Sequence, residues 1–139
     1  MGKRKTRNET DTDLLLSSIV EGLHRKKGKD VVSLDLSKIE NSVCKHFVIC
    51  HGESNTQVDA LADSVMDTVL ETIGEKVWHK EGKSNATWVL LDYADIVVHI
   101  FQKSYRDFYK LEDLWADAKL TKHEDVVKSK GEKKNVRRK

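Results

Sequence analysis

Apolar side chains recur at helical spacing near the start of the chain. Leu15, Ile19 and Leu23 stand four positions apart, and Leu16 and Val20 adjoin them. This spacing predicts one apolar stripe on an amphipathic helix over residues 12–27. Three basic residues suit the negative end of the helix dipole, and Gly28 directly after them would end the helix.

A second helix is marked at both of its ends. Ser54 stands three residues before Gln57, the spacing of a capping box that satisfies free backbone N–H groups of the first turn. An apolar stripe follows, and Gly74 ends it. Between the two helices, residues 30–36 and 46–50 are rich in β-branched and apolar side chains and predict two strands.

The run "TWVLLDYADIVVHIF", residues 87–101, predicts a hairpin of two strands with a tight turn at Tyr93 and Ala94. Residues 76–80 come before it and predict a short edge strand, whose lysines oppose unwanted pairing. Helices that alternate with strands early, followed by a hairpin, are typical of an α/β fold. We therefore expect a single domain with a mixed sheet of about five strands flanked by helices.

The last periodic segment, residues 104–118, predicts a short helix or helical turns capped by Ser104. The side chains expected to point inward from it are Phe108, Leu111, Leu114 and Trp115. Beyond Leu120 the chain carries charge without periodicity, and we expect disorder there. The predicted organisation is a basic N-terminal extension (1–10), a globular domain (11–120) and a basic, disordered C-terminal tail (121–139).

The formal net charge of +2 hides an uneven distribution. Residues 1–10 carry a net charge of +3, residues 119–139 carry +6, and residues 11–118 between them carry −7. An acidic globule suggests a basic protein partner, and basic ends suggest a polyanion such as RNA, although charged tails also serve solubility alone. The sequence contains no disulfide framework, no secretory signal and no apolar run of membrane-spanning length. We expect a cytoplasmic protein.

Asp92, Asp95 and His99 are the hairpin residues most able to carry chemistry. Asp95 and His99 share one face of the second strand and Asp92 lies across the turn, so the three side chains can in principle form a metal site. Carboxylates beside a hairpin are more often turn-forming and solubilising residues, and that interpretation is favoured. Gly52 and Ser54 stand at a strand-to-helix turn of the kind that binds phosphate, but no P-loop or dinucleotide motif occurs. We expect no active site, no metal and no cofactor.

The hairpin has a second possible role as a binding surface. Trp88 and Tyr93 offer large rings close to carboxylates, a combination that suits a basic protein partner. Composition alone leaves open whether Trp88 is a surface anchor or part of the core, and whether Tyr93 is only a turn residue.

Three segments in order, "GESNTQVDALAD" (52–63), "WVLLDYADIVVHIF" (88–101) and "RDFYKLEDLWADA" (106–118), closely resemble the ribosomal silencing factor family, also called iojap-like. The similarity extends over residues 12–120. Ala94 replaces a glycine that is common in the family, which argues against an obligatory left-handed backbone at this position.

The resemblance implies a non-enzymatic repressor of translation. Such a protein binds the large ribosomal subunit through its protein L-fourteen and blocks joining of the small subunit when nutrients are scarce. The resemblance also implies a fold similar to that of nucleotidyltransferases, and a homodimer when the protein is free. The partner-binding residues that we predict are Trp88, Asp92, Tyr93, Asp95 and His99. Trp88 would be the apolar anchor, the carboxylates would face basic side chains, and the basic tails would contact ribosomal RNA; no small-molecule substrate and no membrane is expected.

Two alternatives stay open. Active nucleotidyltransferases hold magnesium with an Asp-x-Asp pair shortly after Gly-Ser, and no such pair follows Gly52 here. A nucleotide- or phosphate-handling enzyme of that descent would have to use Gly52, Ser54 and the Asp92/Asp95 pair. The other alternative is a nonspecific RNA-binding protein that works through its basic tails.

Overall fold

The computed structural model describes residues 9–42, 44–115 and 117–124 of the chain. In chain order the elements are α1 (Glu9–Arg25), β1 (Lys29–Asp35), β2 (His46–Gly52), α2 (Asn55–Ile73), β3 (His79–Glu81), β4 (Trp88–Asp92), β5 (Ile96–Gln102), α3 (Lys103–Tyr109), α4 (Leu111–Leu114) and β6 (Lys119–His123). Among these elements no helix is long and apolar enough to span a membrane.

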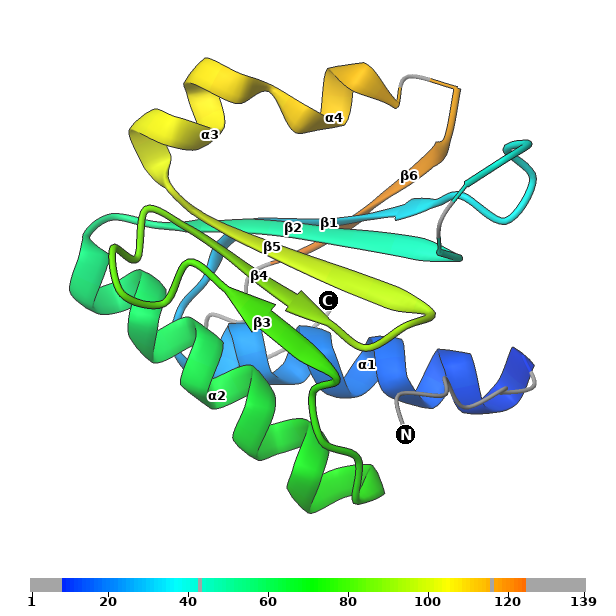
Figure 1. Cartoon of the computed structure of the whole chain (residues 1–139), viewed down its shortest axis with the longest axis horizontal. Helices are drawn as coiled ribbons and strands as arrows, with labels where there is room; N and C mark the ends of the chain where they lie inside the picture. The colour runs from blue at the N-terminus through cyan, green and yellow to red at the C-terminus, as the bar shows by residue number, and fades with distance from the viewer. Residues whose placement is uncertain (1–8, 43, 116, 125–139) are drawn as a thin grey trace, which may run out of the picture.

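The strands form one mixed sheet with the order β3-β4-β5-β2-β1-β6. The central strands β2 and β5 pair in parallel, and the neighbouring pairs on either side are antiparallel. Helices α1 and α2 cover one face of the sheet, called here the α1/α2 face, and α3 and α4 lie over the opposite α3/α4 face (Figure 1). The predicted α/β fold with a mixed sheet flanked by helices is therefore confirmed, with six strands in place of about five.

The main core lies between the sheet and the two long helices. Gly22 of α1 permits their close approach, because a Cβ at this position would lie 2.8 Å from the Cα of Val65 in α2.

The predicted cap of α2 is confirmed: the Ser54 hydroxyl accepts from the backbone N–H of Gln57 at 3.1 Å, and Gly74 ends the helix in the left-handed conformation. The Gln57 side chain reaches back one residue further than expected and accepts from the N–H of Glu53. The two side-chain hydrogen bonds of Ser54 and Gln57 therefore hold the strand-to-helix turn in place.

The predicted hairpin of β4 and β5 is present, but its connection contains Tyr93, Ala94 and Asp95, one residue more than the predicted turn. The Asp92 carboxylate accepts a hydrogen bond from the backbone N–H of Ala94 at 2.7 Å, and Ala94 has a φ angle of 75°. The expectation that alanine argues against a left-handed backbone here is therefore wrong. The turn requires positive φ from whichever residue stands at this position, and the Asp92 side chain helps to hold it.

Replacement of Ala94 by glycine is expected to raise the free energy of unfolding by about 0.5–1 kcal/mol. Positive φ strains a residue that carries a Cβ, and glycine removes that strain. Chemical denaturation measures the change. Gly82→Ala is the opposite control, because Gly82 has a φ of 86° and a Cβ there would overlap the carbonyl oxygen of Trp88. A glycine at position 94 that destabilises the protein would contradict the assigned strain.

The C-terminal third departs most from the sequence predictions. The edge strand begins at His79 instead of residue 76, and Gln102 rather than Ser104 stands at the N-cap of α3. A positive φ of 48° at Lys110 breaks the expected single helix into α3 and α4, which cover only part of their face of the sheet. Leu111 is buried in a smaller apolar cluster on this face, and Trp115 packs against that cluster. Phe108 and Leu114 are 78% and 73% exposed, so their predicted inward orientation is wrong.

Strand β6 corrects the expected disorder beyond Leu120. It pairs with β1 from Lys119 to His123 and forms one edge of the sheet. Its side chains are largely exposed, so the strand needs no alternation of apolar and polar residues. Its backbone hydrogen bonds to β1 hold it in place, and the sequence therefore carries no local signal for it. Residues 1–8 and 125–139, which hold most of both predicted tails, lie outside the described residues, and the proposed domain division stays a prediction.

Candidate partner-binding surface

Strand β4 sends alternate side chains to the two faces of the sheet. Val89 and Leu91 enter the core under α1 and α2. Trp88 and Leu90 pack on the α3/α4 face, against a smaller apolar cluster built around Phe47, Phe101 and Leu111. The indole is therefore neither a plain core residue nor a plain surface residue, since it is half-buried at the border of the second core.

Aromatic rings continue from Trp88 onto helix α3. The Trp88 ring lies 5.0 Å from that of Tyr109, which in turn lies 5.1 Å from Phe108 and 6.4 Å from Tyr105. We call these four residues the aromatic patch. Tyr105, Phe108 and Tyr109 are exposed, and Leu114 adds further exposed apolar surface on α4. Contiguous exposed apolar surface with large rings is typical of a protein-binding site.

The structure brings only some of the predicted partner-binding residues together. Trp88 and Asp92 lie on the α3/α4 face, where Asp92 also caps the hairpin turn. Asp95 instead approaches α1, where the Thr12 hydroxyl donates to its carboxylate at 3.5 Å, and its carbonyl accepts from the amides of Lys45 and His46. Asp95 and His99 therefore do not converge, as they would in a metal site.

Tyr93 and His99 are too deeply buried to contact a partner directly. Tyr93 is 1% exposed and belongs to the core under α1 and α2, because the turn directs its ring toward the helices. His99 is 5% exposed beneath Trp88 and Phe47 on the other face. Burial lowers the pKa of His99 to about 4, so its imidazole is neutral at physiological pH. His99 therefore lies directly beneath the Trp88 indole, whereas Tyr93 lies on the other side of the sheet.

The geometry also separates the residues that a nucleotide-handling enzyme would need. In the parallel pair of β2 and β5, His46 aligns with Ile96 and Gly52 aligns with Gln102. Gly52 and Ser54 therefore lie near one end of these strands, whereas Asp92 and Asp95 lie at the other end, roughly 20 Å away. No single phosphate or magnesium ion can contact both sets, and the Ser54 hydroxyl already caps α2.

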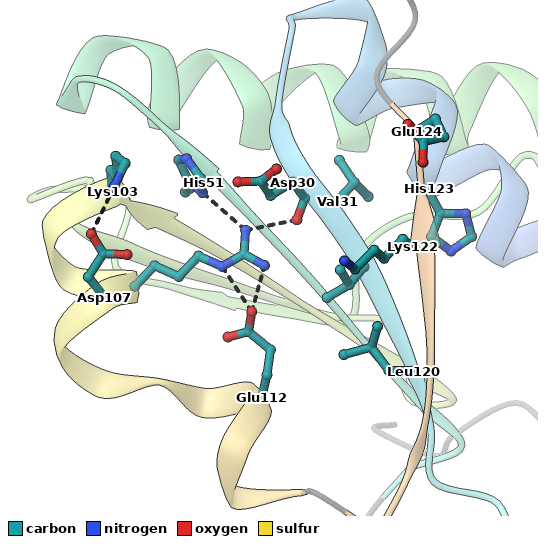
Figure 2. Close-up of a pocket in the computed structure, with 12 residues that line it drawn as sticks. Asp30, Val31, His51, Lys103, Asp107, Glu112, Leu120, Lys122, His123 and Glu124 are labelled. Carbon is teal, nitrogen blue, oxygen red and sulfur yellow. Dashed lines mark hydrogen bonds and ion pairs between the residues drawn. The ribbon is translucent and has the colours of Figure 1, made fainter.

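A cavity of about 710 Å³ lies under α3 and α4, beside β1 and β6 (Figure 2). Arg106, which is 7% exposed, projects from α3 into its wall. The guanidinium donates to the Glu112 carboxylate at 2.7 and 3.2 Å, to the carbonyl of Asp30 at 2.8 Å and to His51 Nδ1 at 3.0 Å. Burial and the positive charge of Arg106 lower the pKa of His51, so this histidine is a neutral acceptor.

The polar groups of this cavity largely satisfy one another. Lys103 pairs with Asp107 at 2.9 Å, and Arg106 pairs with Glu112. Asp30 has a φ of 49° next to an irregularity in β1, and this conformation directs its carbonyl toward Arg106. The arrangement is best explained as a link that holds α3 and α4 on the sheet. Sequence reasoning missed Arg106, because its partners on β1 and β2 lie more than 50 positions away and no local pattern marks it.

Comparisons with known proteins are consistent across sequence and structure. A family model described as "ribosomal silencing factor during starvation" matches residues 8–139, which includes the basic C-terminal segment. A ribosomal silencing factor of Halalkalibacterium halodurans is 39% identical over 81% of this chain and 95% of its own length. One of Bacillus subtilis is 44% identical over 68% of this chain and 79% of its own length. A crystal structure of a Chromobacterium violaceum protein, 38% identical, has a TM-score of 0.69 and covers 73% of this chain and 83% of that one.

Proposed function

The chain belongs to the ribosomal silencing factor family, and from this membership we propose that it is a cytoplasmic repressor of translation that docks on the large ribosomal subunit. The proposed contact is protein L-fourteen of that subunit, as the family resemblance implies. Docking would keep the small subunit from joining and so lower translation when nutrients are scarce. The proposed action is steric, with no catalysis and no cofactor.

The aromatic patch is the observation that carries this proposal. Its rings run without interruption from β4 to α3, and Asp92 lies on the same face of β4, at the other end of the strand from Trp88. A few residues supply most of the binding energy of a typical protein interface, Trp and Tyr are common among them, and nearby carboxylates favour a basic partner. We propose that the aromatic patch, which includes Trp88, is the apolar anchor, that Asp92 faces basic side chains, and that His99 supports the Trp88 indole from inside. Asp95 and Tyr93 lie toward α1 and α2 on the other side of the sheet, so we assign them no part in this anchor.

Steric occlusion needs only a folded domain held at the right place. A domain of about a hundred residues is roughly 25–30 Å across, which is enough to keep two ribosomal surfaces apart. We further propose that the basic ends add contacts to ribosomal RNA, and that the free protein forms a homodimer. In a homodimer a second copy would cover apolar surface that is otherwise exposed.

Sedimentation of the purified protein with separated ribosomal subunits tests the proposal. The protein is expected to migrate with large subunits and not with small ones, and to lower the yield of joined ribosomes. Equal migration with both subunits would contradict the proposal and favour the nonspecific RNA-binding alternative. Low-micromolar, magnesium-dependent nucleotide binding in calorimetry would instead favour the enzyme alternative.

A truncation after Glu124 separates the two modes of binding in the same experiment. It leaves β6 intact and removes seven basic residues against two acidic ones. Binding to large subunits is expected to weaken but to remain specific. Its dependence on salt should become shallower, because fewer phosphate contacts release fewer counterions.

A further inference from the structure

A single hydrogen bond connects the indole of Trp88 to the interior of the protein. Nε1 of Trp88 lies 3.1 Å from Nδ1 of His99 on the neighbouring strand. An indole nitrogen only donates, so Nδ1 must accept and the proton of the neutral imidazole must reside on Nε2. The interaction therefore fixes both the tautomer of His99 and the direction of the Trp88 ring.

The other nitrogen of His99 has no evident structural use. Nε2 is buried, and within the part of the chain that the structure describes no acceptor lies within hydrogen-bonding distance of it. A buried donor without an acceptor destabilises a folded protein. Packing alone would thus favour an aliphatic residue of similar size at this position, since Phe47 and Phe101 already surround it.

Trp88 is placed where its orientation matters most. Its ring joins the buried cluster, through Phe101 at 4.8 Å, to the exposed patch, through Tyr109 at 5.0 Å. Rings that are held in one orientation before binding lose less conformational entropy on binding than rings that must be ordered. The acceptor on His99 supplies a directional restraint that ring packing lacks.

We propose that His99 is a positioning residue, whose Nδ1 holds the Trp88 indole in the orientation that the partner recognises. This inference rests on the proposed function, because it assumes that Trp88 anchors the docked complex. It assigns to His99 a role in docking that requires no contact with the partner.

His99→Leu and His99→Asn test the inference. Leucine removes both the acceptor and the unpaired donor, whereas the asparagine side-chain oxygen can occupy nearly the position of Nδ1. His99→Leu is expected to weaken binding to large subunits roughly three- to tenfold, the cost of ordering one large side chain on binding. Its midpoint of unfolding should be unchanged or higher, which a merely structural role would not produce. His99→Asn should restore most of the affinity.

Hydrogen exchange of the indole N–H groups provides a readout independent of binding. The chain has three tryptophans, and Trp88→Phe assigns the signal of Trp88. That signal should exchange at least tenfold faster in His99→Leu than in the wild type and in His99→Asn. If the leucine variant does not fold, His99→Asn still decides the matter: slow indole exchange together with lost affinity would overturn the proposal.

A double-mutant comparison completes the test. Phenylalanine lacks the indole N–H, so in the Trp88→Phe background His99→Leu should cause no further loss of binding. An equal loss in both backgrounds, or wild-type affinity in folded His99→Leu, would overturn the positioning role while leaving the proposed function intact. A wild-type protein that binds no large subunits would overturn the proposed function itself.

Discussion

Phe108→Lys is expected to weaken binding to the large ribosomal subunit by at least about 30-fold, which corresponds to roughly 2 kcal/mol or more. The ring is 78% exposed and contacts the ring of Tyr109 at the solvent-facing end of the aromatic patch. The change removes a large apolar side chain and places a positive charge against a basic partner. Because the side chain contributes little to the core, stability should not change.

Leu70→Lys is the matched control for this variant. Leu70 is an exposed apolar residue on α2, which covers the opposite face of the sheet. It receives the same new charge, and it should bind large subunits like the wild type. Sedimentation measures binding, and circular dichroism verifies the fold of both variants. If Phe108→Lys binds normally and Leu70→Lys does not, the docking surface lies on the α1/α2 face instead.

Arg106→Leu is expected to lower the free energy of unfolding by about 3 kcal/mol or more. Arg106 is a nearly buried cation with acceptors on α4, β1 and β2, so its removal leaves the Glu112 carboxylate and the carbonyl of Asp30 without their donor. The effect should concentrate in α3 and α4. Hydrogen exchange there should accelerate more than in α2, and binding should fall because these helices carry Phe108 and Tyr109.

Two comparisons identify the cause of that loss. Lys103→Met breaks an exposed ion pair with Asp107 on the same helix and should leave the denaturation midpoint unchanged. The double variant Arg106→Leu/Glu112→Leu replaces the buried pair with apolar groups and should recover part of the lost stability. An Arg106→Leu protein as stable as the wild type would show that the link does not hold α3 and α4 in place.

The sequence by itself determined the helices and strands that short-range interactions stabilise. The Ser54 cap, the Gly74 terminus, the apolar stripes of α1 and α2, and the two strands of the hairpin follow from periodicity and capping, which act within one or two turns of chain. The sequence also carried the family resemblance, because the three matching segments keep their order along the chain. The fold class follows from those elements, since few arrangements of layers bury the apolar sides of both helices and strands.

Tertiary structure alone decided the rest, because each case depends on partners distant in sequence. β6 is held by backbone hydrogen bonds to β1, which require no apolar side chains, so composition suggested disorder there. Arg106 is buried because β1 and β2 supply its acceptors from more than 50 positions away.

The residues predicted to bind a partner lie in different environments, again because of contacts between segments distant in sequence. The hairpin sequence places Trp88, Tyr93 and His99 close together along the chain, but period-two alternation and the left-handed turn at Ala94 direct their side chains to different environments. Phe108 enters the surface only because Lys110 breaks the last helix and α3 lies over the ring of Trp88. The sequence by itself thus determined that residues 87–101 form a hairpin, and packing across the sheet determined which side chains of that hairpin reach solvent.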